Sequence, residues 1–136
     1  IKDYLKLKSE SGAKLPAKKW NQLEKILKVL ERKGALMPRA AYSGKNVCAA
    51  VCWIKDFNGL VYFQAAGNNE GRQKGAAFLL VNEILKDYSG KNIYIDFEGA
   101  VDEGVRRFYR GFGATNEAYP VLESKGMKFL KKITKK

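Results

Sequence analysis

The stretch of sequence that decides the fold is "AAGNNEGRQKGAAFLLVNEIL", residues 65–85. It starts as the end of an apolar run and crosses a loop rich in Gly and Asn. It then enters a helix that opens with Gly75, Ala76 and Ala77. The first four N–H groups of a helix have no partner within it, and the helix dipole adds partial positive charge there. A phosphate can bind such amides where no bulky side chain blocks its approach.

The residues just before this helix add positive charge, which would attract an anion. Arg72 and Lys74 stand at its rim, and we predict that residues 72–77 form a phosphate cradle. An alternative structural role remains open, in which Gly75 is a packing glycine and the alanines let the helix lie close to a sheet. A P-loop is excluded because the interval from Gly71 to Gly75 is too short and no Lys-Ser/Thr follows. The spacing of a dinucleotide fingerprint is also absent.

The composition limits the chemistry that the chain can perform. Its 136 residues suit a single domain with a buried core. There are 26 basic and 14 acidic residues, and the net charge of +12 attracts nucleic acid, anionic membranes or phosphorylated small molecules. The absence of histidine excludes Ser-His-Asp and Cys-His catalysis and removes a common zinc ligand, so we expect no metal.

The two cysteines and the lengths of the apolar segments bear on the cellular compartment of the protein. Cys48 and Cys52 lie four residues apart in one predicted strand, too far apart for a disulfide. We interpret both as buried thiols in a reducing compartment and expect a cytoplasmic protein without a membrane partner. No apolar run approaches the roughly 20 residues that span a bilayer. Because the first residue is Ile1, we expect the chain to be part of a longer protein.

The hydrophobic periodicity predicts a fold of the α/β (α+β) class. Apolar residues at helical spacing start after Pro16 and end at Gly34, and Pro38 suits the start or an edge of the first strand. A mixed, mostly antiparallel twisted sheet with helices on both faces is expected, in the order α-α-β-β-β-α-β-α-β-β. The expected elements are a helix ending near Gly12, the helix from Pro16, strands "LMPRAAYS", "VCAAVCWIK" and "LVYFQAA", the helix after Gly75, strand "NIYIDF", helix "VDEGVRRFYRGF", and strands "AYPVLE" and "MKFLKKI".

Two motifs resemble one family. R-Q-K-G-A-A, residues 72–77, resembles the R/Q-x-x-G-x-G/A signature of the GNAT superfamily of N-acetyltransferases, and "FYRGFGA", residues 108–114, resembles its late F-Y-x-x-F-G motif. The resemblance spans nearly the whole chain, although the family's usual first strand is missing. It implies an acyltransferase that moves an acetyl or other acyl group from acyl-CoA to a small-molecule or peptide amine. The acyl-CoA would lie between the family's fourth and fifth strands.

The resemblance also assigns site residues. Tyr109 matches the tyrosine that donates a proton to the leaving thiolate, with a half-buried structural tyrosine as the alternative. Glu98 follows the strand expected at residues 92–97. It could act as a base, directly or through water, or could hold the following loop by accepting backbone N–H bonds. Arg106, Arg107 and Arg110 could form a solvated helix face or grip an anion. The implied acyl-CoA-binding residues are Gln64, Ala65, Ala66, Arg72, Gln73, Lys74, Gly75, Ala76 and Ala77.

A narrower resemblance concerns the segments "YIDFEGA" and "GVRRFYRGFGA". They are similar to the second domain of Fem-type aminoacyltransferases, which carry two GNAT-like domains in tandem, with Ala100 here where Ser is often found. This likeness implies a C-terminal half-protein with a GNAT-like domain upstream and either acyl-CoA or aminoacyl-tRNA as donor. A third hypothesis is a non-catalytic GNAT-like binding module.

Overall fold

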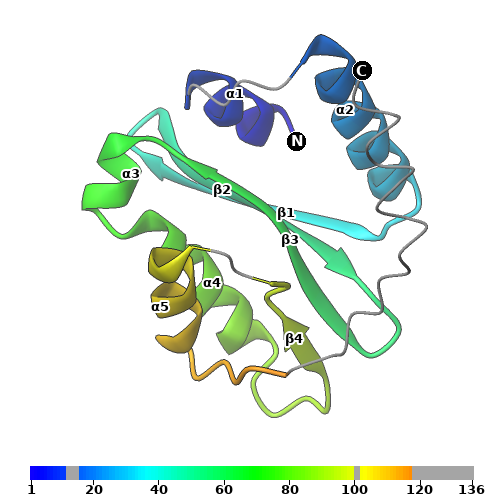
Figure 1. Cartoon of the computed structure of the whole chain (residues 1–136), viewed down its shortest axis with the longest axis vertical. Coiled ribbons are helices and arrows are strands. Elements are labelled where there is room, and N and C mark those ends of the chain that lie inside the picture. The colour runs from blue at the N-terminus through cyan, green and yellow to red at the C-terminus, as the bar shows by residue number, and fades with distance from the viewer. Residues whose placement is uncertain (12–15, 100–101, 118–136) are drawn as a thin grey trace, which may run out of the picture.

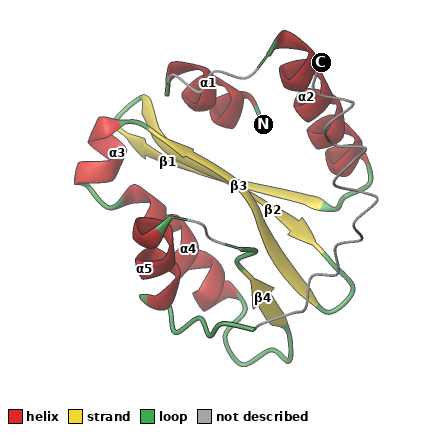
Figure 2. Ribbon diagram, in the orientation of Figure 1, coloured by secondary structure: helices red, strands yellow, loops and turns green. Residues whose placement is uncertain are grey.

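The computed structural model describes residues 1–11, 16–99 and 102–117. The backbone forms an α+β fold in which helices lie on both sides of a twisted sheet (Figures 1 and 2). Its elements are α1 (Lys2–Glu10), α2 (Ala17–Arg32), β1 (Leu36–Ser43), β2 (Asn46–Lys55), β3 (Gly59–Gly67), α3 (Asn69–Gln73), α4 (Ala76–Asp87), β4 (Tyr94–Asp96) and α5 (Glu103–Arg110).

The sheet has the strand order β1-β2-β3-β4. The first three strands form the predicted antiparallel meander, and β4 pairs in parallel with β3. β1 is an edge strand, which is where Pro38 is tolerated because proline cannot donate to a ladder. The prediction of a mixed, mostly antiparallel sheet is therefore confirmed.

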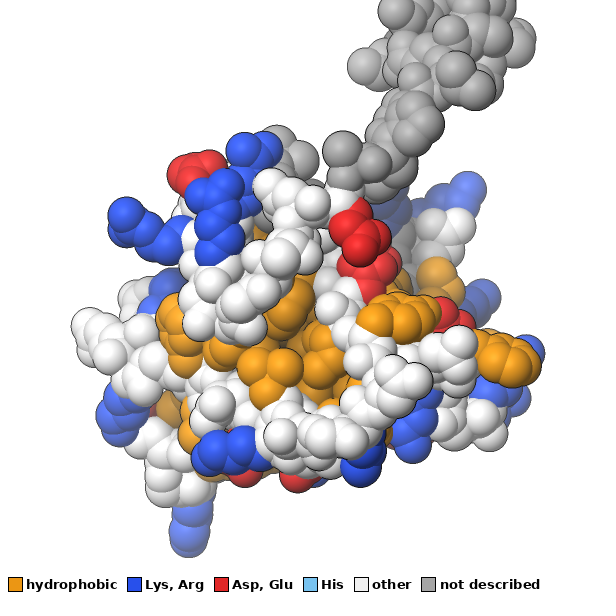
Figure 3. Space-filling view, turned by 90° about the horizontal axis from the view of Figure 1, so that it is seen from below, with side chains coloured by type: hydrophobic (Ala, Val, Ile, Leu, Met, Phe, Trp, Pro, Cys, Tyr) orange, Lys and Arg blue, Asp and Glu red, His pale blue; other side chains and the backbone are white. Residues whose placement is uncertain are grey.

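Two hydrophobic cores lie on opposite faces of the sheet. On one face α1 and α2 bury Tyr4, Leu7 and Leu27 against the strands. On the other face α4 and α5 lie against the sheet (Figure 1), and Trp53 of β2 is fully buried there among aromatic neighbours. Seen from below, hydrophobic side chains gather in the middle of the molecular face and most Lys and Arg lie around its edge (Figure 3).

Two β-bulges interrupt the alternation of side chains along the strands. Cys48 is skipped between the pairs Ala41↔Ala49 and Tyr42↔Val47, and Phe63 is skipped between Cys52↔Gln64 and Trp53↔Tyr62. An extra residue shifts the following side chains to the other face. As a result Cys48 packs in the α4 core and Cys52 in the α1 core. Both are free and buried, as predicted.

The order of the elements differs from the prediction in one respect. The loop before α4 contains the short helix α3, which is capped by Asn68, whose side-chain Oδ1 accepts a hydrogen bond from the N–H of Gly71. The two strands expected at 118–123 and 127–133 lie outside the described residues and stay a prediction. The start of α2 after Pro16 and its end before Gly34, which has φ +67°, agree with the sequence. Every helix in the described ranges is too short or too polar to cross a bilayer.

Candidate functional site

A cleft of about 690 Å³ opens where β3 and β4 separate. The two strands pair over only three residues, from Gly59↔Tyr94 to Val61↔Asp96. Beyond that point no described strand pairs with this edge of β3. The cleft is lined by residues 62–65 of β3, Ala77 of α4, residues 97–99 after β4 and the side of α5 from Asp102 to Tyr109.

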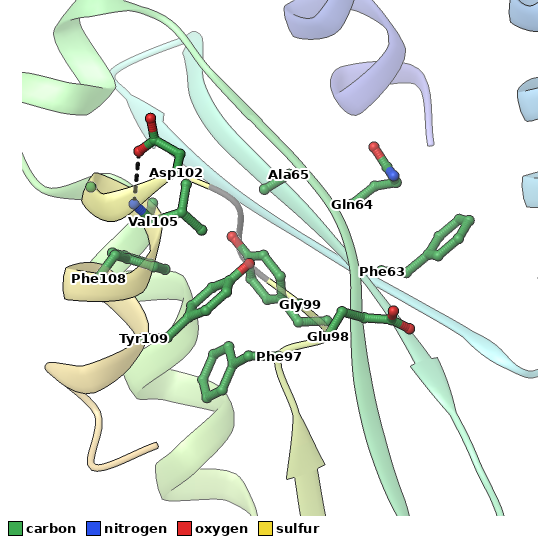
Figure 4. A pocket seen from close by; sticks show the side chains of 13 residues that line it. Phe63, Gln64, Ala65, Phe97, Glu98, Gly99, Asp102, Val105, Phe108 and Tyr109 are labelled. Atoms are coloured by element: carbon green, nitrogen blue, oxygen red, sulfur yellow. Dashed lines mark hydrogen bonds between the residues drawn. The ribbon is translucent and has the colours of Figure 1, made fainter. Parts of the chain in front are cut away.

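The bulge at Phe63 determines what β3 presents to this cleft. Figure 4 shows Phe63 and Gln64 pointing away from α5. The side chain of Gln64 accepts a hydrogen bond from the hydroxyl of Tyr4, at 3.0 Å, on the α1 side of the sheet. Ala66 also packs on that side, and Ala65 packs on the α4 side. Gln64 can therefore contribute its backbone to the cleft, where the N–H and C=O groups of an unpaired strand edge can bind an extended amide chain.

Aromatic rings form one wall of the cleft. Tyr109 stacks on Phe97 with ring centroids 4.7 Å apart and meets the edge of Tyr62 at 5.7 Å. Its side chain points from α5 toward β3 (Figure 4), and its hydroxyl bonds to no other described residue. Burial raises the pKa of Tyr109, and the negative charge of Glu98 raises it further. The hydroxyl therefore stays protonated at neutral pH and can donate a hydrogen bond.

Glu98 adopts an unusual backbone conformation at the end of β4. Its φ is +59°, a left-handed conformation that is rare for a residue other than glycine. Its N–H donates to Oδ1 of Asp96 at 2.7 Å, so Asp96 supports this turn. In Figure 4 the Glu98 carboxylate is turned away from the Tyr109 ring. It is exposed and bonds to no other residue in the described ranges.

The first turn of α4 forms the mouth of the cleft. Gly75 has φ +65°, and an added Cβ would meet no atom within 4 Å, so its role is conformational and not packing. The packing glycine is Gly71, where an added Cβ would lie 2.2 Å from the carbonyl oxygen of Cys48. Ala76 is buried against the sheet, whereas Ala77 lines the cleft.

Hydrogen bonds of α3 and its C-terminal turn occupy some of the amides in the predicted cradle of residues 72–77. The amides of Arg72, Lys74 and Gly75 already donate to Asn68, Glu70 and Arg72, at 3.0, 3.0 and 3.2 Å. A phosphate cannot use amides that are already paired. In the described part of the chain, the unpaired amides of this region are those of residues 76–78, at the start of α4.

The predicted basic residues lie beside this mouth and are held by neighbours. Arg72 donates to the carbonyl of Gly67 at 3.2 Å and to the side chain of Asn69. Lys74 lies 2.8 Å from Glu70 and donates to Oγ of Ser43 at 2.7 Å. Gln73 is the exposed last residue of α3. Both cations are exposed and can turn toward an anion at the mouth.

The remaining charged groups are divided between the cleft and the outer surface. The charged residues that line the cleft are Glu98 and Asp102. Arg106 and Arg110 lie outside this lining and approach Glu103 at 3.6 and 3.5 Å. We therefore place the arginine cluster on the outer face of α5 and not in the cleft.

Asp102, Tyr62 and Phe97 are among the cleft residues that were not predicted from the sequence. Asp102 caps α5 by accepting a hydrogen bond from the N–H of Val105 at 3.1 Å (Figure 4). An Asp directly before a helical run is a known cap signal and could have indicated its position. Tyr62 and Phe97 belong to the aromatic wall. Only the strand register and the separation of β3 from β4 show that they face one cleft.

Comparisons with known proteins agree with this geometry at the level of the fold. No protein-family model and no curated protein matches the chain significantly. A solved aminoglycoside antibiotic 6′-N-acetyltransferase from Acinetobacter haemolyticus is similar in structure, with a TM-score of 0.65, 17% identity, and 91% of this chain and 90% of that chain covered.

Two further acetyltransferase structures are similar. A possible acetyltransferase from Clostridium difficile 630 has a TM-score of 0.64, 19% identity and coverage of 90% and 86%. An acetyltransferase from Trypanosoma brucei has a TM-score of 0.60, 13% identity and coverage of 91% and 92%. At these identities the likeness shows only that this chain shares its fold with these acetyltransferases.

Proposed function

We propose that the chain is an N-acyltransferase that transfers an acetyl or other acyl group from acyl-CoA to an amine. The observation that carries the proposal is one cleft that joins three features. These are Ala77 at the start of α4, where the amides of residues 76–78 have no partner among the described residues, the edge of β3 beyond Val61, with which no described strand pairs, and the hydroxyl of Tyr109.

These features fit the parts of an acyl-CoA in order. The amides at the start of α4 suit the diphosphate, and the exposed cations Arg72 and Lys74 come just before this helix in the chain. The uncharged arm, which contains two amides, suits the edge of β3. The donor supplies a thioester carbonyl, which is activated for attack by an amine.

The charge of the lining favours acyl-CoA over an aminoacyl-tRNA as donor. Among the described residues that line the cleft, Glu98 and Asp102 are acidic and none is basic. An acyl-CoA keeps its phosphates at the mouth and sends a neutral arm inside. The 3′ end of a tRNA would carry phosphates close to these two carboxylates, where like charges repel.

Two side chains can handle the protons of the transfer. Tyr109 holds a proton on Oη that it can give to the leaving thiolate, and its raised pKa keeps this proton in place until then. The exposed Glu98 carboxylate can accept the proton that the attacking amine loses. Because Glu98 is turned away from the Tyr109 ring, the amine can approach from a different side than the leaving group (Figure 4).

Isothermal titration calorimetry with acetyl-CoA tests the proposal. We expect the 136-residue chain to bind with a dissociation constant below about 1 mM, the range of ordinary enzyme substrates. Ala77→Glu places a bulky anion at the mouth and should abolish binding, whereas the matched control Ala77→Ser should bind like the unchanged chain. A chain that is folded by circular dichroism but shows no binding would overturn the proposal.

A further inference from the structure

The surplus of positive charge is unevenly distributed along the chain. Residues 1–33 contain ten basic and four acidic residues. Residues 34–117 contain ten basic and nine acidic residues. Residues 118–136 contain six basic and one acidic residue. The segment that builds the cleft is therefore almost neutral. The surplus within the described residues belongs mainly to α1 and α2, on the other face of the sheet.

α2 carries this charge in a regular row. Lys18, Lys25 and Arg32 are seven residues apart, so they lie nearly above one another on the helix. All three are exposed, and none forms an ion pair with another residue that the structure describes. We call these three residues the α2 ridge. Lys28 lies beside it and is paired with Glu24 at 2.6 Å.

The α2 ridge lies on the side of α2 opposite the residues that pack on the sheet, and Lys25 and Arg32 line a surface pocket there. Leu27 is fully buried between α2 and the sheet, and Lys25 lies roughly 160° around the helix from it. The half-buried Leu23 and Leu30 pack against the same core as Leu27. The helix is thus fixed by its apolar side, and the ridge extends over about 21 Å of rigid surface.

We propose that the α2 ridge binds the phosphate backbone of nucleic acid, independently of base sequence. A row of unpaired cations on a rigid helix matches a polymer of regularly spaced phosphates. A membrane is the less suitable occupant, because a helix that lies in the interface inserts its apolar face into lipid. In α2 most of that face, made of Leu23, Leu27 and Leu30, already packs against the sheet, although Ile26 and Val29 are exposed.

The position of the ridge also separates it from the proposed chemistry. α2 and the cleft between β3, β4 and α5 lie on opposite faces of the sheet (Figure 1). The cleft lining repels polyanions through Glu98 and Asp102. Nucleic acid on α2 therefore leaves the cleft open, and the two functions can be tested independently.

The test is fluorescence anisotropy with a labelled single-stranded RNA of about 20 nucleotides, long enough to cover the ridge. The ridge variant Lys18→Gln/Lys25→Gln/Arg32→Gln is compared with Lys45→Gln/Lys86→Gln/Lys91→Gln. Both variants lose three positive charges, and the control positions are exposed and lie outside α2. Circular dichroism confirms that each variant is folded.

We expect the unchanged chain to bind at about 50 mM salt and to lose affinity steeply toward about 200 mM. The ridge variant should bind at least about tenfold more weakly, and its slope of log K against log salt should be shallower by about two. The control should change less than about threefold. Equal losses in both variants, no binding at low salt, or stronger ridge-dependent binding to phosphatidylserine vesicles than to RNA would each overturn the proposal.

Discussion

The ammonium of Lys74 lies 2.8 Å from the carboxylate of Glu70, one turn earlier in the chain and beside the start of α4. Hydrogen bonding between the two groups raises the pKa of Lys74 and lowers that of Glu70. In the free protein, a cation that stands next to the proposed phosphate site is thus held by the protein's own anion. Glu70 is a competitor of any phosphate that binds at the mouth.

Glu70→Gln should therefore strengthen acyl-CoA binding. The change removes a negative charge from the mouth and releases Lys74 to face the phosphates. The pair is exposed and worth little on its own, so we expect a gain of only about two- to threefold in affinity. The gain should disappear at about 1 M salt, where exposed charges are screened within about 3 Å.

A matched control lies on α4 itself. Glu83→Gln breaks the ion pair with Lys86, which is 3.1 Å long and also exposed, but is remote from the mouth. Calorimetry should find the acyl-CoA affinity of this variant unchanged. An equal gain in both variants would show that net charge alone, and not the release of Lys74, governs binding.

Tyr109→Phe should lower the rate of acyl transfer without weakening donor binding. The ring stack on Phe97 survives the change, and the lost hydroxyl bonds to no described residue. General acid catalysis typically contributes at least about 10²-fold, so we expect a fall in kcat of that order with little change in the free energy of unfolding. Thiol release from acetyl-CoA with a panel of amines measures the rate.

The control for this prediction is Tyr42→Phe. Tyr42 is exposed on β1 and donates to Asp3 at 2.7 Å, outside the cleft lining. Its variant should keep the full rate. If Tyr109→Phe turns over at the same rate as this control, Tyr109 is a structural residue.

Three glycine-to-alanine variants should differ in stability in a fixed order. At Gly71 the added Cβ would collide with a backbone carbonyl at 2.2 Å, and overpacking of this kind costs about 3 kcal/mol. At Gly75 there is room, but φ is +65°, which costs about 1 kcal/mol for an L-residue. At Gly99 there is room and no positive φ, so the change should be nearly neutral. Urea unfolding measures all three, and a Gly71 variant as stable as the Gly99 variant would contradict the close contact of α3 with β2.

Some of this architecture could be predicted from sequence because local signals determine it. Pro16 and Gly34 mark the start and the end of α2, and the turn residues between the apolar runs fix the meander. Ala77, one of the small residues that begin α4, lines the cleft. Each of these signals acts over a few neighbouring residues.

The features that were missed depend on distant contacts. α3 is only five residues long and is flanked by glycines, so its helical periodicity is too short to detect. The bulges at Cys48 and Phe63 arise from pairing with neighbouring strands. The amides of Arg72, Lys74 and Gly75 are already hydrogen-bonded because α3 and its C-terminal turn form there. Within the predicted site of residues 72–77, the amides without a partner among the described residues are therefore those of Ala76 and Ala77.

The stability of the protein should fall at alkaline pH. Burial raises the pKa of Cys52 from its ordinary 9.0 to about 11, so the unfolded chain loses this proton first. Stability is complete below about pH 9 and declines as the pH rises toward 11, by up to about 1.4 kcal/mol per pH unit for one group. Burial also raises the pKa of Tyr4 to about 12, which extends the decline.

Cys52→Ala tests this dependence. The variant should be less stable at pH 8 because of the lost packing, by about 1 kcal/mol. Between about pH 9 and 11 its free energy of unfolding should fall less steeply than that of the unchanged chain. Parallel curves from urea unfolding across this range would show that the Cys52 thiol does not cause the decline.

Glu98→Gly should stabilise the protein and lower its rate of acyl transfer. Glu98 holds φ +59° at a position where glycine suffers no clash with its own Cβ, so relief of the strain should raise the free energy of unfolding by about 1 kcal/mol. The loss of the carboxylate should lower the rate of transfer at least about tenfold.

Glu98→Gln separates the two effects, because it keeps the strain and removes only the charge. Its stability should stay unchanged while its rate falls. A strained residue that can be replaced by glycine with a gain in stability and no loss of rate has no part in the chemistry, and that result would remove Glu98 from the proposed site.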